Sequence, residues 1–276
     1  MYGKSIELFL VNGTADSLIT AELSNWNGEA IKIPRTEVLE CNRNDIKGAG
    51  VYFLFCKEDD GEDAVYIGEA ENCLDRLKQH LRDFQIDKED YYWNAAVVFV
   101  GRDLNKALIR YLENRLVDIA RECGRYKVLT KNTYKKTVMK ESQIASMEEF
   151  IDNIKILIAT LGYNVLKAIP QATNDTKYIY CKRAGALATG FISKEGLTVL
   201  KGSKVSENIA DSFIRRSKSY YNLRNQLERD GIIVAGVFQK DYEFSAPSAA
   251  SSVVLGRPSN GNVEWKDENG IILKEL

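Results

Sequence analysis

Apolar and polar residues alternate in short stretches along the front of the chain, a period typical of β-strands. The pattern predicts strands at 5–11, 20–26 and 30–34, with the turn-like stretch 12–16 between the first two. We expect these strands to form an N-terminal β element of residues 1–45, which is too small to be an independent domain.

In residues 46–123 the spacing of apolar residues alternates between that of a strand and that of a helix, and it predicts elements in the order β-β-α-β-α. The expected elements are strands 50–56 and 64–68 around an Asp60-Gly61 turn, a helix capped by Asn72, a strand at 95–100 and a helix capped by Asp103. This order predicts a small α+β domain, in which helices flank a three-stranded antiparallel sheet.

The sequence of the C-terminal half predicts a connecting segment followed by a second small α+β domain. Residues 124–175 form the connecting segment, with a helix at 146–161 that starts with a capping box of Ser146 and Glu149. Residues 176–276 form the second domain, which begins after the boundary signal Asn174-Asp175. Its expected elements are strands 177–182, 186–192 and 196–201, a helix near 207–229, a strand at 231–238 and a short helix at 247–255.

Composition excludes several classes of protein. The chain has 276 residues, 45% of them hydrophobic and 28% charged, as in ordinary globular proteins. No apolar run approaches the roughly 20 residues of a membrane span, and the first residues lack the apolar stretch of a signal peptide. The five cysteines include no CxxC pair, which argues against a zinc knuckle or a disulfide framework. We therefore expect a cytoplasmic protein.

The formal net charge of −1 is the sum of an acidic N-terminal part and a basic C-terminal part. Residues 1–120 carry 14 Lys and Arg against 22 Asp and Glu, whereas residues 121–276 carry 24 against 17. A polyanionic partner would be held more readily by the back of the chain, although an excess of this size is also compatible with an ordinary surface.

Two tyrosines flank the predicted hairpin in glycine-bearing triplets, Gly50-Val51-Tyr52 and Tyr66-Ile67-Gly68. Cross-strand neighbours lie close enough for Tyr52 and Tyr66 to share one site, and glycine allows a close backbone approach. Tyrosine is also a common strand residue, so the pair alone is compatible with plain packing.

Three further residues are candidates for phosphate chemistry. Arg76 and the chain's one histidine, His80, are four residues apart and so share a helix face. A guanidinium binds phosphate oxygens and neutralises developing charge. Glu113 lies at the margin of the apolar face of the later helix, where a carboxylate can ligate Mg²⁺ together with waters.

The order and spacing of these five residues resemble the GIY-YIG nuclease signature, over about 75 residues. The resemblance implies a one-metal phosphodiester hydrolase in which Tyr52 or Tyr66 acts on the attacking water and Arg76 binds the scissile phosphate. Glu113 would hold Mg²⁺ or Mn²⁺, and His80 would assist proton transfer or contact phosphate. Where some relatives have a lysine after the second triplet, this chain has Glu69. That departure removes one cation that could lower the pKa of a tyrosine.

The C-terminal hundred residues resemble the DUF4357 family, a domain often appended to such nucleases. The resemblance is carried by Gly202-Ser203-Lys204-Val205, residues 244–250, Gly256 and residues 260–265. A basic helix in this region bears Arg215, Arg216, Lys218, Arg224 and Arg229 beside two tyrosines. We expect these side chains to contact the DNA backbone, with a solvated amphipathic helix as the alternative.

The leading hypothesis is thus a metal-dependent DNA endonuclease whose C-terminal domain aids substrate binding, in restriction, defence or repair. One alternative is a nucleic-acid-binding module that has lost cleavage. Another is a metal-free protein in which the tyrosines only pack.

Overall fold

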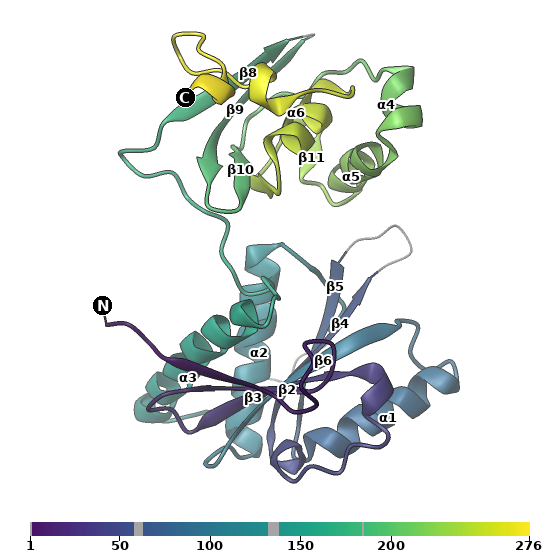
Figure 1. Cartoon of the computed structure of the whole chain (residues 1–276), viewed down its shortest axis with the longest axis vertical. Helices are drawn as coiled ribbons and strands as arrows, with labels where there is room; N and C mark the ends of the chain where they lie inside the picture. Colours follow the sequence, from purple (N-terminus) through teal and green to yellow (C-terminus); the bar gives the residue numbers. More distant parts are fainter. Residues whose placement is uncertain (1, 58–62, 132–137, 184) are drawn as a thin grey trace. The chain divides into compact units, whose positions relative to one another are not determined.

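Figure 1 shows a computed structural model that describes residues 2–57, 63–131, 138–183 and 185–276. The chain divides into two compact units, Met1–Ala168 with two hydrophobic cores and Ile169–Leu276 with one. The division falls before the Asn174-Asp175 boundary signal. No helix in the described part of the chain is long and apolar enough to cross a membrane.

A seven-stranded mixed sheet in the order β1-β2-β3-β6-β4-β5-β7 forms the first unit. Its strands are β1 (Ile6–Leu10), β2 (Ile19–Leu23), β3 (Gly28–Pro34), β4 (Gly50–Lys57), β5 (Asp63–Ala70), β6 (Trp93–Gly101) and β7 (Lys127–Val128). All neighbours are antiparallel except β5 and β7. The α+β class is as expected, but the sheet is larger than three strands. The first three strands extend it because β3 pairs with β6 along its whole length.

Alternation along β4 builds two cores, one on each face of the sheet. Val51, Phe53 and Phe55 point into the core formed with α2 (Lys106–Cys123) and α3 (Glu141–Thr160). Tyr52, Leu54 and Cys56 point into the other core, which is formed with α1 (Cys73–Gln85). Helix α1 therefore covers one face, and α2 and α3 cover the other (Figure 1).

Two of the three predicted helix caps are wrong. Asn72 caps α1 as expected, since its side chain accepts a hydrogen bond from the Asp75 amide. Helix α2 is capped by Asn105, whose side chain accepts from two amides of the first turn; Asp103 instead accepts a hydrogen bond from Asn27. Helix α3 begins five residues before Ser146, which lies inside it.

The predicted connecting segment 124–175 contains a short strand near its start, because β7 pairs in parallel with Ala64 and Val65 of β5. Thr130 continues this edge: its hydroxyl group accepts from the Ile67 amide and donates to the Ile67 carbonyl. The predicted Asp60-Gly61 turn lies outside the described residues. Short 3₁₀ turns at Arg35–Glu37 and Asp45–Lys47 complete the first unit.

The second unit has a four-stranded antiparallel sheet in the order β13-β10-β9-β8, with helices packed against it. Its elements are β8 (Tyr178–Arg183), β9 (Ala186–Ser193), β10 (Gly196–Val199), α4 (Asp211–Arg216), α5 (Lys218–Arg229), β11 (Ile233–Val234), β12 (Val237–Phe238), β13 (Tyr242–Phe244), α6 (Pro247–Leu255), α7 (Gly261–Glu264) and a 3₁₀ turn at Leu273–Glu275. The expected helix 207–229 is two helices, separated at Ser217, whose backbone is non-helical. The expected strand 231–238 is a tight hairpin with Ala235 and Gly236 at positive φ.

Candidate functional site

The two tyrosines lie side by side on the sheet face that α1 covers. Register places Tyr52 opposite Gly68, and Tyr66 opposite Leu54, so the phenols are diagonal neighbours rather than at corresponding places. Their ring centroids are 6.2 Å apart, with 26° between the planes. A Cβ atom at Gly68 would collide with the Tyr52 hydroxyl group and crowd the Tyr66 ring, so the second triplet requires its glycine.

Helix α1 brings Arg76 and His80 to the tyrosines. The Nε–H of Arg76 donates to the Tyr52 hydroxyl oxygen at 3.2 Å, and His80 Nε2 lies 2.9 Å from the same oxygen. The His80 ring centroid is 5.4 Å from that of Tyr52 and 5.3 Å from that of Tyr66. Arg76 and His80 therefore meet at the Tyr52 hydroxyl oxygen, and Tyr66, the fourth of the five predicted site residues, lies beside them.

Glu89 belongs to the same cluster, and the sequence did not single it out. Its carboxylate oxygens lie 2.7 and 2.9 Å from His80 Nδ1. It comes from the loop between α1 and β6, where no periodic pattern fixes the direction of a side chain. Tyr91, two residues further on, stacks on Tyr66 at 5.6 Å.

Burial keeps the phenols and the imidazole of this cluster uncharged at neutral pH. It raises the pKa of Tyr52, an effect that Tyr66 adds to and that Arg76 opposes. The pKa of Tyr66 is raised by burial as well, again against Arg76. Burial lowers the pKa of His80, although its bond to Glu89 works in the other direction. A phenol of this cluster therefore loses its proton only to a well-placed acceptor.

Glu113 does not join these hydrogen bonds. It projects from α2, which covers the opposite face of the sheet from α1. Its charge nevertheless acts on the cluster. Glu113 adds to the rise that burial causes in the pKa of Tyr66, and Arg76 offsets part of the rise that burial and Glu69 cause in the pKa of Glu113. Glu113 is thus an electrostatic neighbour of the tyrosine cluster, and the structure shows no direct contact between them in its described residues.

Glu113 offers a buried carboxylate oxygen to a cation, although Lys106 and Arg110 of the same helix already place two positive charges near it. The side chain is buried, and Oε2 has no hydrogen-bond partner among the described residues. Glu69, also buried, lies on the same face of the sheet and binds Lys106 and Arg110 of α2 at 3.0 and 3.7 Å. Lys106, Arg110 and Glu113 follow one stripe of that helix. An unpaired buried carboxylate oxygen is a fitting ligand for Mg²⁺, which takes one or two carboxylates and keeps several waters. No group of three or more potential metal ligands occurs in the described part of the chain.

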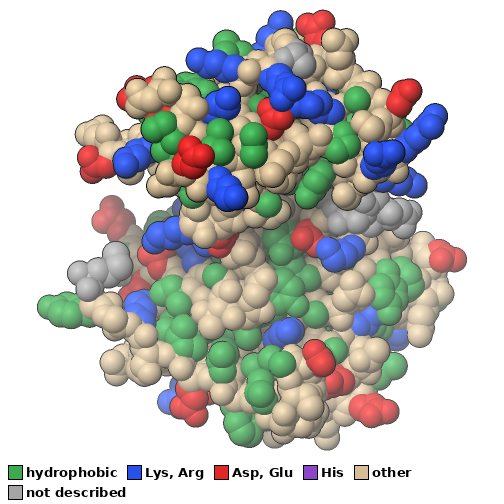
Figure 2. Space-filling view, turned by 45° about the horizontal axis from the view of Figure 1, so that its top comes forward, with side chains coloured by type: hydrophobic (Ala, Val, Ile, Leu, Met, Phe, Trp, Pro, Cys, Tyr) green, Lys and Arg blue, Asp and Glu red, His purple; other side chains and the backbone are tan. Residues whose placement is uncertain are grey.

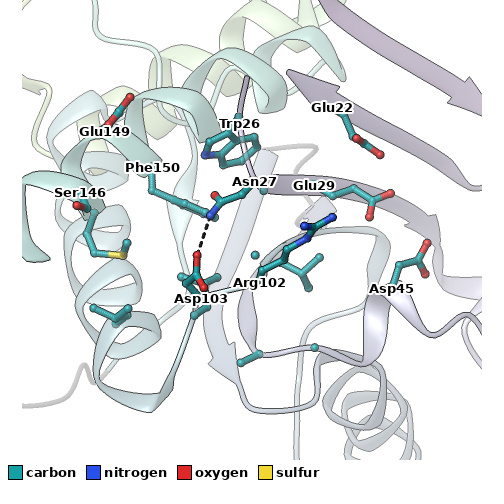
Figure 3. Close-up of a pocket in the computed structure, with 18 of the residues that line it drawn as sticks. Glu22, Trp26, Asn27, Glu29, Asp45, Arg102, Asp103, Ser146, Glu149 and Phe150 are labelled. Atoms are coloured by element: carbon teal, nitrogen blue, oxygen red, sulfur yellow. Dashed lines mark hydrogen bonds between the residues drawn. The ribbon is translucent and has the colours of Figure 1, made fainter. Parts of the chain in front are cut away.

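A hollow of about 1280 Å³ lies on the first unit, away from the tyrosine cluster and beside the turn between β2 and β3 (Figure 3). Trp26 packs on Phe150 there, and Asn27 donates to Asp103 at 3.0 Å. Its carboxylates are Glu22, Glu29, Asp45, Asp103 and Glu149. Burial and the charges of Asp45 and Glu22 raise the pKa of Glu29 to about 7. This excess of carboxylates repels phosphate, so the hollow is unsuited to a nucleic-acid backbone.

The five basic residues predicted to contact DNA do not share one environment. Arg215, Arg216, Lys218 and Arg229 are exposed. Arg224 is buried, and its guanidinium donates to the backbone oxygens of Ser206 and Val253 and to the Glu228 carboxylate. The expectation that Arg224 contacts DNA is wrong, because its guanidinium is buried and already donates to these three oxygen atoms. Figure 2 shows Lys and Arg side chains interspersed with acidic ones on the visible face of the second unit.

Comparison with known proteins identifies a family only for the C-terminal part of the chain. No curated protein and no solved structure matches the sequence. The family comparison gives no support for the nuclease resemblance of the first unit. It does match residues 179–276 to the model described as a domain of unknown function, DUF4357. These residues, which include all the strands and helices of the second unit except the start of β8, are a DUF4357 domain.

Proposed function

We propose that the first unit is a divalent-metal-dependent endonuclease of the GIY-YIG type, which hydrolyses phosphodiester bonds in DNA. The observation that carries the proposal is the meeting of Tyr52, Arg76 and His80 at one phenol oxygen, with Tyr66 alongside. These residues belong to the signature and come from three separate elements, β4, β5 and α1. Packing alone does not require a guanidinium and an imidazole on the same phenol.

Each residue has a chemical part in this proposal. Arg76 is half-buried beside the partly exposed Tyr66, so its guanidinium can bind a scissile phosphate while its Nε–H stays on Tyr52. Tyr66 is the more accessible phenol, whereas Tyr52 is 1% exposed. Tyr66 is therefore the better placed to orient an attacking water, and Tyr52 links it to His80. Glu113, with Glu69 nearby, would hold Mg²⁺ or Mn²⁺, which polarises the phosphate and the leaving oxygen when bound.

The DUF4357 domain would aid substrate binding in this proposal. Its exposed Arg215, Arg216, Lys218 and Arg229 supply cations for phosphate contacts, which give affinity without sequence preference. The front of the chain is acidic, so binding of a polyanion would depend on this second unit.

The test is cleavage of supercoiled plasmid, branched DNA and single-stranded DNA with Mg²⁺, Mn²⁺ or a chelator. Glu113→Ala is expected to abolish metal-dependent cleavage, and Arg76→Ala to slow it by roughly 10²–10³-fold, the effect of removing one preorganised donor. Glu122→Ala on α2 and Arg82→Ala on α1 remove the same charges at exposed positions and should cleave like wild type. Cleavage that survives both Glu113→Ala and Arg76→Ala would show that the site is misassigned.

A catalytically inactive nucleic-acid-binding module is the second candidate. The burial of the Tyr52 phenol and the separation of Glu113 from the other four residues favour it. It predicts metal-independent DNA binding and no cleavage of any of the three substrates, so the same experiment separates the two functions.

A further inference from the structure

The one histidine of the chain is held at both ring nitrogens by oxygen atoms. His80 is 0% exposed, with the Glu89 carboxylate at Nδ1 and the Tyr52 hydroxyl group at Nε2. A carboxylate can only accept a hydrogen bond, so the hydrogen lies on Nδ1. In the neutral ring Nε2 then carries a lone pair, and Tyr52 must donate its hydroxyl hydrogen to it.

Tyr52 is oriented from its other side by Arg76, which donates to the phenol oxygen at 3.2 Å. Hydrogen bonds therefore run in one direction, from Arg76 to Tyr52, from Tyr52 to His80 and from His80 to Glu89. A cation stands at the start of this chain and a carboxylate at its end. That arrangement favours movement of the phenol proton towards the imidazole, since a phenolate would face Arg76 and an imidazolium would face Glu89.

We propose that Glu89 is the positioning residue of a proton relay, holding His80 in the Nδ1–H tautomer so that Nε2 can take the proton of Tyr52. In that step the O–H bond of Tyr52 breaks and an N–H bond forms at Nε2, with no other change in bonding. In the proposed nuclease, Tyr66 takes one proton from the water that attacks phosphorus and passes its own to the Tyr52 phenolate beside it, so the water loses one proton and His80 holds one more. This use rests on the proposed nuclease function, but the tautomer itself does not.

The alternative is that His80 only fills space in the core. The titratable and charged groups around its ring are Tyr52, Tyr66, Arg76, Asp83 and Glu89, with Tyr91 stacked on Tyr66. Among the described residues only Glu89 forms a hydrogen bond with Nδ1, so Glu89→Gln tests the effect of this one carboxylate on the tautomer of His80. A glutamine at this place can present either its oxygen or its NH₂ group to Nδ1, and so no longer enforces one tautomer.

Long-range ¹H–¹⁵N NMR of the full-length labelled chain reads the tautomer directly, because the single histidine gives one set of ring signals. We expect Nδ1–H with an unprotonated Nε2 at pH 7, and a measurable Nε2–H population in Glu89→Gln. Asp90→Asn, the matched change at the exposed neighbour, should leave the spectrum unchanged. An Nε2–H tautomer or an imidazolium in the wild type at pH 7, or an unaltered spectrum in Glu89→Gln, overturns the proposal.

Kinetics give a second readout if the chain cleaves DNA. Glu89→Gln should lower kcat by roughly 10²-fold with little change in KM, the lower end of the range for losing proton-transfer catalysis. It should also move the acid limb of the pH–rate profile to lower pH, because Glu89 raises the pKa of His80. If the expected tautomer is found but the chain does not cleave DNA, Glu89 keeps its role at His80 and the nuclease function is refuted. If the chain cleaves DNA but the tautomer is wrong, the nuclease function stands and the role of Glu89 is refuted.

Discussion

Glu113→Gln is the perturbation that most directly tests the buried carboxylate. Burial, followed by the charge of Glu69, raises the pKa of Glu113 from 4.5 to about 7, while Lys106, Arg110 and Arg76 offset part of the effect. Because the pKa is raised on folding, the ionised group destabilises the fold. The cost is absent below pH 4.5, grows as pH rises and is complete above pH 7.

The size of the effect follows from the difference in pKa. At about 1.36 kcal/mol per pKa unit, a rise from 4.5 to about 7 gives a ceiling of about 3 kcal/mol. Glutamine keeps the shape but leaves a buried amide short of partners, at a cost of about 1 kcal/mol or more. Glu113→Gln should therefore stabilise the metal-free protein by about 1–2 kcal/mol at pH 8.5. At pH 4.5 the gain should vanish, and the cost of the buried amide should leave Glu113→Gln less stable than the wild type by up to about 1 kcal/mol.

Urea unfolding in a chelator at the two pH values measures this difference. Trp26 and Trp93 report on the first unit and Trp265 on the second. The exposed Glu122→Gln on the same helix is the control, with no expected change at either pH. Added Mn²⁺ should stabilise the wild type, by about 1.4 kcal/mol for each tenfold excess over Kd, and leave Glu113→Gln unchanged. Equal destabilisation at both pH values, or equal gains from Mn²⁺, would refute the reasoning.

Two further substitutions test the packing of the site and the role of the second unit. Gly68→Ala places a methyl group against Tyr52, so urea unfolding should show a loss of about 1–3 kcal/mol, whereas Gly3→Ala, in open space, should show none. The double variant Arg215→Ala, Arg216→Ala should weaken DNA binding and lower its dependence on salt concentration, and unchanged titrations would exclude both residues from the interface. Arg224→Ala should instead destabilise the second unit, by about 1–3 kcal/mol for each backbone oxygen left without a partner.

Local sequence determined the parts of this protein that depend on near neighbours along the chain. The apolar runs around the two glycine triplets predicted β4 and β5, and Asn72 predicted the start of α1. The four-residue spacing of Arg76 and His80 predicted that they share a face, and the structure brings both to Tyr52. Each of these results follows from a fixed period or a cap, so no distant residue was needed.

Tertiary structure decided what depends on pairing between distant segments. Asp103 and Asn105 are equally good caps by sequence, and the choice follows from a bond between Asp103 and Asn27, which lies far earlier in the chain. Arg224 has the same residue type as the exposed Arg229, yet it is buried because α5 packs on α6. Glu89 reaches His80 only through the path of a loop, and Glu113 lies across the sheet from α1 because β5 stands between the two helices. Composition and periodicity are blind to such contacts, since these depend on how the chain returns to itself.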